Sequence, residues 1–358
     1  MTPQNIDFLL VGQGLAGSVL ADHLLQRGCS VRVINSPHRP SASRAAAGLY
    51  NPITGRKLNK TWRADDLFPY LESFYPAWEQ RLRTSFFHSI PIYRPFLGAE
   101  EQNDWATQAD NIHFVPYVQQ VASEGAYDAF VHDPWGGLLL RRCGYLDVPT
   151  LLSAYRQFLS ERNWYQATEF DPLRLVIATD HVVYERWRAR KIIFCDGAGG
   201  PQNPFFNWLP FRPVKGEMLL IKPTQTLPVV FNRGVFVIPQ GELAKVGSTY
   251  DHQTLDDTPT ARGRLTLTQK LDQLLKVPYE VVDQWAGVRP ATQDRLPLIG
   301  GHPEHEPLAV FNGFGTKGVS LAPYFAQHFV HCLVKDQPVD QAVDVRRFYP
   351  SYHVSHSS

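Results

Sequence analysis

Three features that are missing from this sequence narrow the class of protein it encodes. No run approaches about 18 consecutive apolar residues, so we expect no membrane-spanning helix. Neither sign of charge is in excess, because 35 Lys and Arg stand against 34 Asp and Glu, and the net charge is +1. That balance gives no electrostatic reason to expect binding to nucleic acid or to an anionic membrane. The first apolar segment begins almost at the first residue, which leaves no room for a secretory signal.

Cysteine is scarce as well. The four cysteines are scattered along the chain without a C-x-x-C pair, at Cys29, Cys143, Cys195 and Cys332. Such spacing favours buried thiols in a reducing compartment over a disulfide framework. His302 and His305 lie in a polar loop and lack the spacing of metal ligands, so the sequence predicts no metal site. Together these absences predict a cytoplasmic protein.

The length and the composition describe an ordinary globular protein. Of the 358 residues, 44% are hydrophobic and 19% are charged. A chain of this length is too long for one simple core, so we expect two domains.

The most informative stretch begins at Ile6 and predicts strand, turn, helix and strand in that order. After an apolar run come Gly12, Gly14 and Gly17, at the G-x-G-x-x-G spacing. The first glycine allows a tight turn, the second lets a pyrophosphate approach the backbone, and the third lets the helix pack closely on the strand. The helix start directs unpaired N–H groups and the positive end of its dipole at the phosphates. We therefore expect a bound dinucleotide, the alternative being a glycine turn with no ligand.

Asn35 departs from this fingerprint. The position that ends the second strand normally carries Asp or Glu, which binds the adenosine ribose hydroxyls. An amide can still hydrogen-bond a hydroxyl, but without the strength that the charge of a carboxylate adds. The identity of the dinucleotide therefore stays open at this point.

The rest of the chain alternates helical and strand patterns. Helices are predicted at 65–82, kinked or divided by Pro76, and at 148–159 and 266–275. Strands are predicted at 86–96, 112–121 and 191–195, as a hairpin over 137–147, and as an antiparallel sheet between 211 and 250. A strand at 308–311, a Gly-rich turn and a helix that ends near Cys332 repeat the order of the first unit. They predict a second site for an anion or a ring oxygen.

The small residues from Ala45 to Gly48 have two interpretations. A backbone with almost no side-chain bulk suits close approach to a flat ring. The alternative is a helix start capped by Ser43. The turn at 196–200 is also made of small residues and could pass close to a cofactor in the same way.

Taken together, these pieces resemble one family. They are the first glycine triplet, the segment 46–49, the strand into 197–199, the strand end at 237–239, and the run G-x-R-P-x-T-x-D-x-x-P-x-I-G from Gly287 to Gly300. In this order they resemble the D-amino-acid oxidase (DAO) family of FAD-dependent oxidoreductases, which includes glycine oxidase, sarcosine oxidase and D-amino-acid dehydrogenases. The resemblance covers most of the chain.

The resemblance implies an α/β fold with a Rossmann-like FAD-binding domain of discontinuous segments and a mixed α+β substrate domain built on an antiparallel sheet. It assigns 1–60, 136–204 and 285–348 to the first domain and 61–135 and 205–284 to the second, with 349–358 as a tail, frayed from Val354. It implies oxidation of a C–N bond of a small amine or amino acid by hydride transfer to flavin N5, with an electron acceptor that the sequence does not identify.

The resemblance also implies site residues. Arg289 matches the arginine that binds the substrate carboxylate in amino-acid oxidases of the family, and the alternative is a structural ion pair with Asp294. Tyr50, for which simple packing is the alternative, and Phe236, which lacks the hydroxyl of the tyrosine in several relatives, are candidates for the substrate pocket. No cysteine lies near Arg289, so FAD is expected to be non-covalent. The candidate FAD-binding residues are Gly12, Gly14, Leu15, Ala16, Gly17, Asn35, Ser43, Arg44, Ala46, Ala47, Gly48, Leu49, Gly197, Ala198, Arg289, Gly313, Gly315, Thr316, Lys317 and Gly318.

Two further departures keep other functions open. Thr316 stands where glycine oxidase has a second carboxylate-facing arginine, and Lys317 is either a charge beside the flavin or a solvated loop residue. One alternative is a flavoenzyme that acts on an amine carried by tRNA or another macromolecule, and a second is a flavin-binding protein without turnover. An NAD-dependent dehydrogenase would rest on the first glycine triplet alone.

Overall fold

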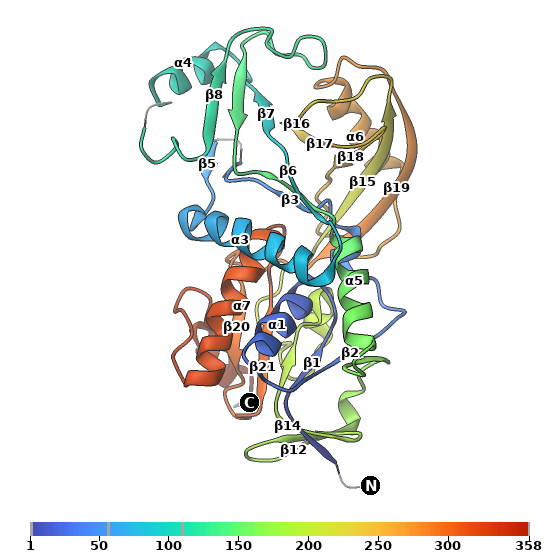
Figure 1. Cartoon of the computed structure of the whole chain (residues 1–358), viewed down its shortest axis with the longest axis vertical. Coiled ribbons are helices and arrows are strands. Elements are labelled where there is room, and N and C mark those ends of the chain that lie inside the picture. Colours follow the sequence, from blue (N-terminus) through green and yellow to red (C-terminus); the bar gives the residue numbers. More distant parts are fainter. Residues whose placement is uncertain (1–2, 56–57, 109–110, 357–358) are drawn as a thin grey trace.

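Two large β-sheets organise the chain. The computed structural model describes residues 3–55, 58–108 and 111–356. Figure 1 shows one sheet below and the other above, with α3 (Ala64–Leu82) lying across the region between them. In the lower part, α1 (Leu15–Gln26) and α7 (Gly318–Lys335) pack against each other beside the first sheet.

The first sheet has eight strands, and its centre is parallel. The central strands follow one another in the spatial order β2 (Val31–Asn35), β1 (Gln4–Val11), β14 (Trp187–Phe194) and β21 (Leu308–Asn312). Val11 pairs with both Ile34 and Phe194, and Phe194 pairs with Val310. Because this register aligns the carboxyl ends of the four strands, the turns that follow them meet at one edge of the sheet.

The second sheet is antiparallel apart from the pair β16 and β7, which runs parallel. Its strands lie in the order β19 (Tyr279–Arg289), β15 (Val214–Pro223), β18 (Leu243–Gly247), β17 (Val235–Gln240), β16 (Val230–Arg233), β7 (Ile92–Pro95), β9 (Gly137–Leu140) and β8 (Val118–Ala122). Alternate residues of β15, such as Leu219 and Ile221, are fully buried in one core with Leu267 and Leu271 of α6 (Ala261–Asp272). Period-two alternation thus gives this sheet one face packed under a helix.

The remaining elements are short or lie at the edges of the two sheets. They are α2 (Ala42–Ala45), β3 (Leu49–Tyr50), β4 (Ile53–Thr54), β5 (Asn59–Lys60), β6 (Phe87–Ser89), α4 (Ala99–Gln108), β10 (Gly144–Leu146), α5 (Val148–Ser160), β11 (Tyr165–Ala167), η1 (Pro172–Arg174), β12 (Leu175–Ile177), β13 (Val182–Tyr184), η2 (Gly197–Gln202), β20 (Leu298–Gly301), η3 (Val345–Phe348) and α8 (Tyr349–His356). All four cysteines are free thiols, as expected. Within the described ranges, no helix is long and apolar enough to cross a bilayer.

One prediction about local structure is wrong, and one of the two alternatives for the helix that contains Pro76 is excluded. The segment 137–147 is not a hairpin, because β9 pairs with β7 and β8 in the second sheet while β10 pairs with β3 and β6 in a separate small sheet. Helix α3 is not divided, but runs through both Pro69 and Pro76. These prolines lie seven residues apart on the solvent-facing side of the helix. Water can therefore donate hydrogen bonds to the backbone carbonyls that the prolines leave without an N–H donor.

The structure also shifts several expected boundaries. Strand β9 and the end of β19, which were expected in the FAD-binding segments, belong to the second sheet. Helix α6 begins and ends earlier than the predicted 266–275. Residues 354–356, expected to be frayed, continue α8, while 357–358 lie outside the described residues. The start of α8 is held by Tyr352, which is buried and donates a hydrogen bond to Glu304 at 2.8 Å.

The interface between α1 and α3 buries two adjacent titratable groups. His23 contacts the Tyr70 hydroxyl at 2.8 Å through one ring nitrogen and stacks on Phe74, and burial lowers its pKa to about 4. Asp22 accepts a hydrogen bond from Arg81 at 2.6 Å, but burial outweighs this contact and raises its pKa to about 6. The two shifts oppose each other in their effect on stability.

We expect Asp22→Asn to expose the pH dependence that His23 contributes. The lowered pKa of His23 removes stability as the pH falls from 6.5 towards about 4, because the unfolded chain takes up the proton first. The raised pKa of Asp22 acts in the opposite direction, removing stability as the pH rises from 3.8 through about 6. Between pH 7 and pH 5 the variant should therefore lose on the order of 1 kcal/mol more unfolding free energy than the wild type. Urea unfolding at both pH values, with the exposed Asp66→Asn as a control, measures this difference, and parallel losses in all three proteins would contradict it.

Candidate active site

A cavity of about 960 Å³ opens where the parallel strands end, against the second sheet. This volume is at the upper end of the range for small-molecule sites, which is roughly 300–1,000 Å³. Its walls come from the turns after β1, β2, β14 and β21, from the segment 39–51, and from strands β15 to β19 of the second sheet. The register of the first sheet therefore places the cavity where α/β folds bind ligands.

The first glycine turn brings backbones unusually close together. Gly12 has a φ of +107°, and a Cβ there would lie 2.4 Å from the carbonyl oxygen of Cys195 at the end of β14. A Cβ at Gly17 would lie 2.0 Å from the carbonyl oxygen of Gly12. No larger residue fits either position, so the glycines set α1 against the strand ends. Gly17 itself does not line the cavity.

Hydrogen bonds from elsewhere in the chain brace this turn. The Ser43 hydroxyl accepts the Leu15 N–H at 3.0 Å, and the Asn35 side-chain oxygen accepts the Gln13 N–H at 2.8 Å. The N–H groups of Gly14 and Ala16 have no acceptor within the described ranges, and both residues line the cavity. The start of α1 thus directs free donors and its positive dipole end into the cavity.

Asn35 therefore has a role that the sequence did not predict. It lines the cavity at the position expected for a ribose ligand, but its oxygen is already used by Gln13 and its amide N–H₂ donates to the Ser36 carbonyl at 3.0 Å. An asparagine can accept one hydrogen bond and donate another at a turn in this way, whereas a carboxylate could only accept.

The small residues after Ser41 form a short helix and then an extended segment. Helix α2 begins after Ser41, so the alternative in which Ser43 caps a helix start is wrong. Ala46, which ends α2, is extended, and it lines the cavity together with the following small residues. Gly48 has a φ of +78°, and a Cβ there would lie 1.9 Å from the Leu146 carbonyl oxygen. The segment is thereby held flat against β10, with its other side on the cavity.

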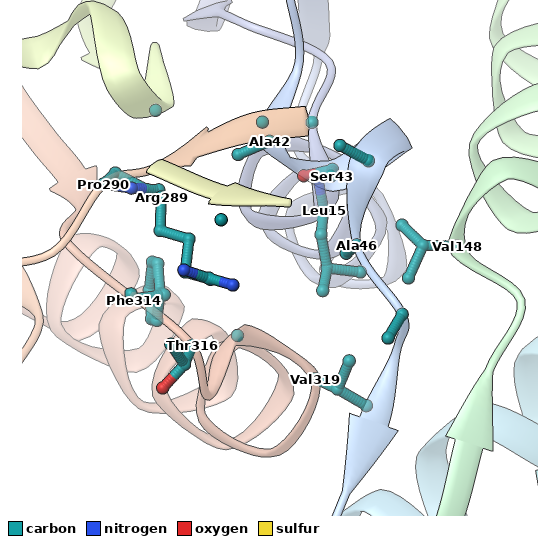
Figure 2. A pocket seen from close by; sticks show the side chains of 18 of the residues that line it. Leu15, Ala42, Ser43, Ala46, Val148, Arg289, Pro290, Phe314, Thr316 and Val319 are labelled. Carbon is teal, nitrogen blue, oxygen red and sulfur yellow. Dashed lines mark hydrogen bonds between the residues drawn. The ribbon is translucent and has the colours of Figure 1, made fainter. Parts of the chain in front are cut away.

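The start of α7 provides a second set of free donors. The N–H groups of Thr316, Gly318 and Val319 have no acceptor in the described part of the chain, and all three residues line the cavity. Gly318 lies beside the start of α1, because a Cβ there would be 3.6 Å from Leu15 Cδ2. Two helix N-termini therefore face one cavity, as Figure 2 shows. Lys317 is half-buried beside them, and burial lowers its pKa.

Arg289 reaches into the same cavity from the end of β19 (Figure 2). Its Nη2 donates to the Ser248 hydroxyl at 2.6 Å, and its Nη1 donates to the Thr249 carbonyl at 3.3 Å. No carboxylate of the described residues forms an ion pair with it, and the expected alternative partner, Asp294, is paired with Arg347 at 3.0 Å. The alternative of an ion pair with Asp294 is therefore wrong. Burial lowers the pKa of Arg289, in keeping with a cation that lacks a counter-ion.

The space for Arg289 depends on a glycine in the neighbouring strand. Arg289 pairs with Val214 of β15, and Gly216 is the next residue on the same face. A Cβ at Gly216 would lie 1.9 Å from Arg289 Nη2. On another side, the guanidinium carbon lies 4.8 Å from the centre of the Tyr250 ring. The arginine thus occupies a slot made by a strand glycine and an aromatic ring.

Both candidates for the substrate pocket line the cavity. Phe236 packs against Gly247, where a Cβ would lie 2.6 Å from its ring. Tyr50 is 3% exposed, its ring centre lies 5.1 Å from that of Phe87, and its hydroxyl donates to the His88 carbonyl at 3.4 Å. Tyr50 therefore packs in the core while one part of it borders the cavity.

Most of the predicted residues meet at this cavity, and several neighbours were missed. Apart from Gly17 and Gly313, every predicted cofactor and pocket residue lines it. Gly313 instead turns the chain, with a φ of +78°. Residues that line the cavity without having been predicted include Gln13, Arg39, Glu169, Asp196, Gly216, Ser248, Tyr250 and Asn312. Of these, a glycine within a strand is a known sign of close backbone approach, and Gly216 could have been found by it.

Asp196 and Asn312 join the ends of two central strands behind the cavity. The Asn312 amide donates to the Asp196 carboxylate at 2.9 Å and to the Gly197 carbonyl at 3.0 Å. Burial raises the pKa of Asp196, while Asn203 and Asn312 stabilise its charged form. This pair fixes the position of the turn at Gly197, one of the predicted cofactor contacts.

Comparisons with known proteins identify the family of the chain. Residues 7–331 match the family described as DAO, FAD dependent oxidoreductase. The glycine oxidase of Pseudomonas aeruginosa is 28% identical over 344 residues, which cover 88% of this chain and 91% of that protein. The crystal structure of glycine oxidase from Geobacillus kaustophilus superposes with a TM-score of 0.76 at 21% identity, covering 96% of this chain and 98% of that one.

A longer relative matches over part of its length. The tRNA 5-methylaminomethyl-2-thiouridine biosynthesis bifunctional protein MnmC of Legionella pneumophila is 24% identical over 327 residues, which are 82% of this chain and 45% of that protein. The family match spans most of the chain, and the two free helix starts, the glycine cradle and the cavity fit a bound FAD. The chain therefore belongs to the DAO family of FAD-dependent oxidoreductases.

Proposed function

We propose that this enzyme oxidises a C–N bond of a small amino acid or related amine, and that Arg289 binds the carboxylate of the substrate. The observation that carries the proposal is Arg289, which lies inside the cavity that fits FAD and has no counter-ion among the residues that the structure describes. A guanidinium has five N–H donors, and two of them are used by Ser248 and Thr249. Three donors remain for a ligand, which is enough for the two-point contact that a carboxylate makes.

Free backbone donors and small residues would hold the cofactor. The Gly14 and Ala16 N–H groups suit the pyrophosphate, and the start of α7 suits the ring edge on which negative charge accumulates. The chemistry that FAD would supply when bound is acceptance of a hydride at flavin N5 from the carbon of the C–N bond, and the imine product would then hydrolyse in water. The cavity-lining cysteine, Cys195, is buried behind Gly12 with a strongly raised pKa, so we propose that FAD is held without a covalent bond.

The role of Arg289 is to orient the substrate. A carboxylate held at two points cannot rotate freely, which fixes the direction of the bond to the adjacent carbon. Phe236 and Thr316 also line the cavity but carry no charge, so carboxylate recognition would depend on Arg289. We also propose that the two domains have different roles, the first sheet holding FAD and the second sheet holding the substrate.

A second candidate substrate is an amine carried by tRNA. The similarity to MnmC of Legionella pneumophila favours it, and that protein's name refers to tRNA. The net charge of +1 gives no overall electrostatic attraction to nucleic acid. The free amino acid is therefore the better supported substrate.

Replacing Arg289 should slow the oxidation of substrates that have a carboxylate and leave the oxidation of amines without one unchanged. We expect Arg289→Met to reduce the rate of anaerobic flavin reduction by glycine, sarcosine or alanine about 100-fold at subsaturating concentration, because losing a charged pair costs roughly 2–5 kcal/mol. The matched amines without a carboxylate, which are methylamine, dimethylamine and ethylamine, should react equally with both proteins. Following flavin absorbance without oxygen needs no knowledge of the electron acceptor. A variant that matches the wild type on every amino acid would contradict the proposal, and a wild type that no compound reduces would favour a flavin-binding protein without turnover.

Ser43→Ala should weaken FAD binding. The change leaves the Leu15 N–H without its acceptor and the start of α1 less firmly held. FAD binding would then have to order this helix start, which costs up to about 1 kcal/mol of binding free energy, or about fivefold in Kd. Ser41→Ala is the matched control, because Ser41 also lines the cavity but its side chain makes no capping hydrogen bond. Titration of the apoprotein with FAD, followed by flavin fluorescence, measures both. Equal affinities for the two variants would count against the bracing role of Ser43.

Binding to tRNA tests the second candidate directly. With a near-neutral net charge, we expect no retardation of unmodified tRNA by this protein in native gels at about 50 mM salt. A shift that disappears as the salt rises to about 200 mM would instead support a tRNA-borne amine.

A further inference from the structure

The loop that carries Tyr250 is fastened to β15 from behind the cavity. Backbone hydrogen bonds join Lys215 and Asp251 at 2.8 and 3.0 Å, and the Glu217 N–H donates to the Thr249 hydroxyl at 2.8 Å. The Lys215 side chain, which is 1% exposed, donates to the Asp256 carboxylate at 2.5 Å and to the Thr258 carbonyl at 2.6 Å. The positions on either side of Tyr250 are therefore tied to the strand.

The end of this loop is fastened by a second buried charge. The Glu217 carboxylate accepts hydrogen bonds from the Thr260 N–H and hydroxyl, both at 2.7 Å, and from the Gln284 amide at 2.8 Å. Along β15, the side chains of Lys215 and Glu217 thus hydrogen-bond to the loop. The alternate residues Gly216 and Met218 line the cavity. One strand holds the arginine slot on one face and the loop on the other.

Tyr250 is held in place although its side chain is 66% exposed. Its neighbour Ser248, two residues earlier on the same side, bonds the Arg289 guanidinium, and the ring itself lies over that group with 4.8 Å between the guanidinium carbon and the ring centre. Because most of Tyr250 stays exposed, placing its ring here buries little apolar surface and contributes little hydrophobic free energy. What it covers is the one cation of the cavity for which we propose a carboxylate ligand.

An aromatic ring over the flat side of a guanidinium affects the direction from which the guanidinium can bind a ligand. Gly216 lies against the guanidinium, and the Tyr250 ring lies 4.8 Å from the guanidinium carbon, so a ligand would meet the N–H edges of Arg289. The contact also restricts the side-chain torsions of the arginine, so less freedom is lost when a carboxylate binds. Attraction between an arginine and an aromatic face contributes this restraint without supplying a competing negative charge.

We propose that Tyr250 is a positioning residue that selects for a substrate carboxylate by holding Arg289 edge-on in the slot above Gly216. The inference rests on the proposed function of Arg289. It assigns the selectivity to the aromatic face of Tyr250, and the hydroxyl group of Tyr250 has no part in it.

Acetate and acetamide are suitable probes, since they have the same shape, differ in charge and carry no amine to be oxidised. The full-length, FAD-loaded protein is titrated with each, and the change in flavin absorbance gives the Kd. We expect Tyr250→Ala to raise the Kd of acetate about fivefold and to leave that of acetamide unchanged, and Tyr250→Phe to bind both like the wild type. Because Tyr250 is exposed, its replacement should change the unfolding free energy little, and equal FAD content and equal urea midpoints verify this.

The outcomes distinguish the two levels of the proposal. If Tyr250→Ala binds acetate like the wild type while Arg289→Met does not, Tyr250 has no positioning role and the carboxylate site stands. If Tyr250→Phe loses as much affinity as Tyr250→Ala, the hydroxyl is responsible and the inference is overturned. If Arg289→Met binds acetate like the wild type, or the wild type does not prefer acetate to acetamide, the carboxylate site itself falls and the inference falls with it.

Discussion

The cavity at the start of α1 depends on two linked contacts between backbones. Gly17 of α1 lies against the carbonyl of Gly12, and Gly12 lies against the carbonyl of Cys195, at separations that leave no room for a Cβ. These contacts set α1 so close to the ends of β1 and β14 that its free N–H groups open on the cavity. Helix α7 is placed in turn by α1, because Gly318 approaches the Leu15 side chain. Two positive helix ends on one cavity are thus a result of packing that only glycine permits.

Positive charge is in excess along the cavity. Its lining includes six cationic residues, Arg39, Arg44, Arg94, Arg233, Arg289 and Lys317, and two acidic residues, Glu169 and Asp196. Arg39 is paired with Glu169, and Arg233 is held by three backbone carbonyls. The two charges of a diphosphate offset part of the excess near the helix starts. Arg289 has no ion pair among the described residues, so the proposed carboxylate ligand would supply its counter-ion.

Patterns within one segment were sufficient to predict the first unit, the glycine turns, α5, α7 and the run that contains Arg289. Pairing between distant strands was not predictable in this way. Leu138–Leu140 and Gly144–Leu146 are equally apolar whichever partner they take, and their partners come from different sheets. The slot around Arg289 was missed for the same reason, because Gly216 and Tyr250 meet it only across strands. The use of Asn35 as a brace depends on the geometry of the turn, which its residue type does not reveal.

The parallel sheet draws its central strands from both ends of the chain. Strand β14 lies between β1 and β21, and α7 follows β21. During synthesis, a chain that has emerged only to residue 300 has the first glycine turn but neither the fourth central strand nor the second helix start. The edge of β14 is then unpaired over residues 192–194. The segment 308–335 therefore does two things at once, because it completes the row of central strands and supplies the second helix start on the cavity.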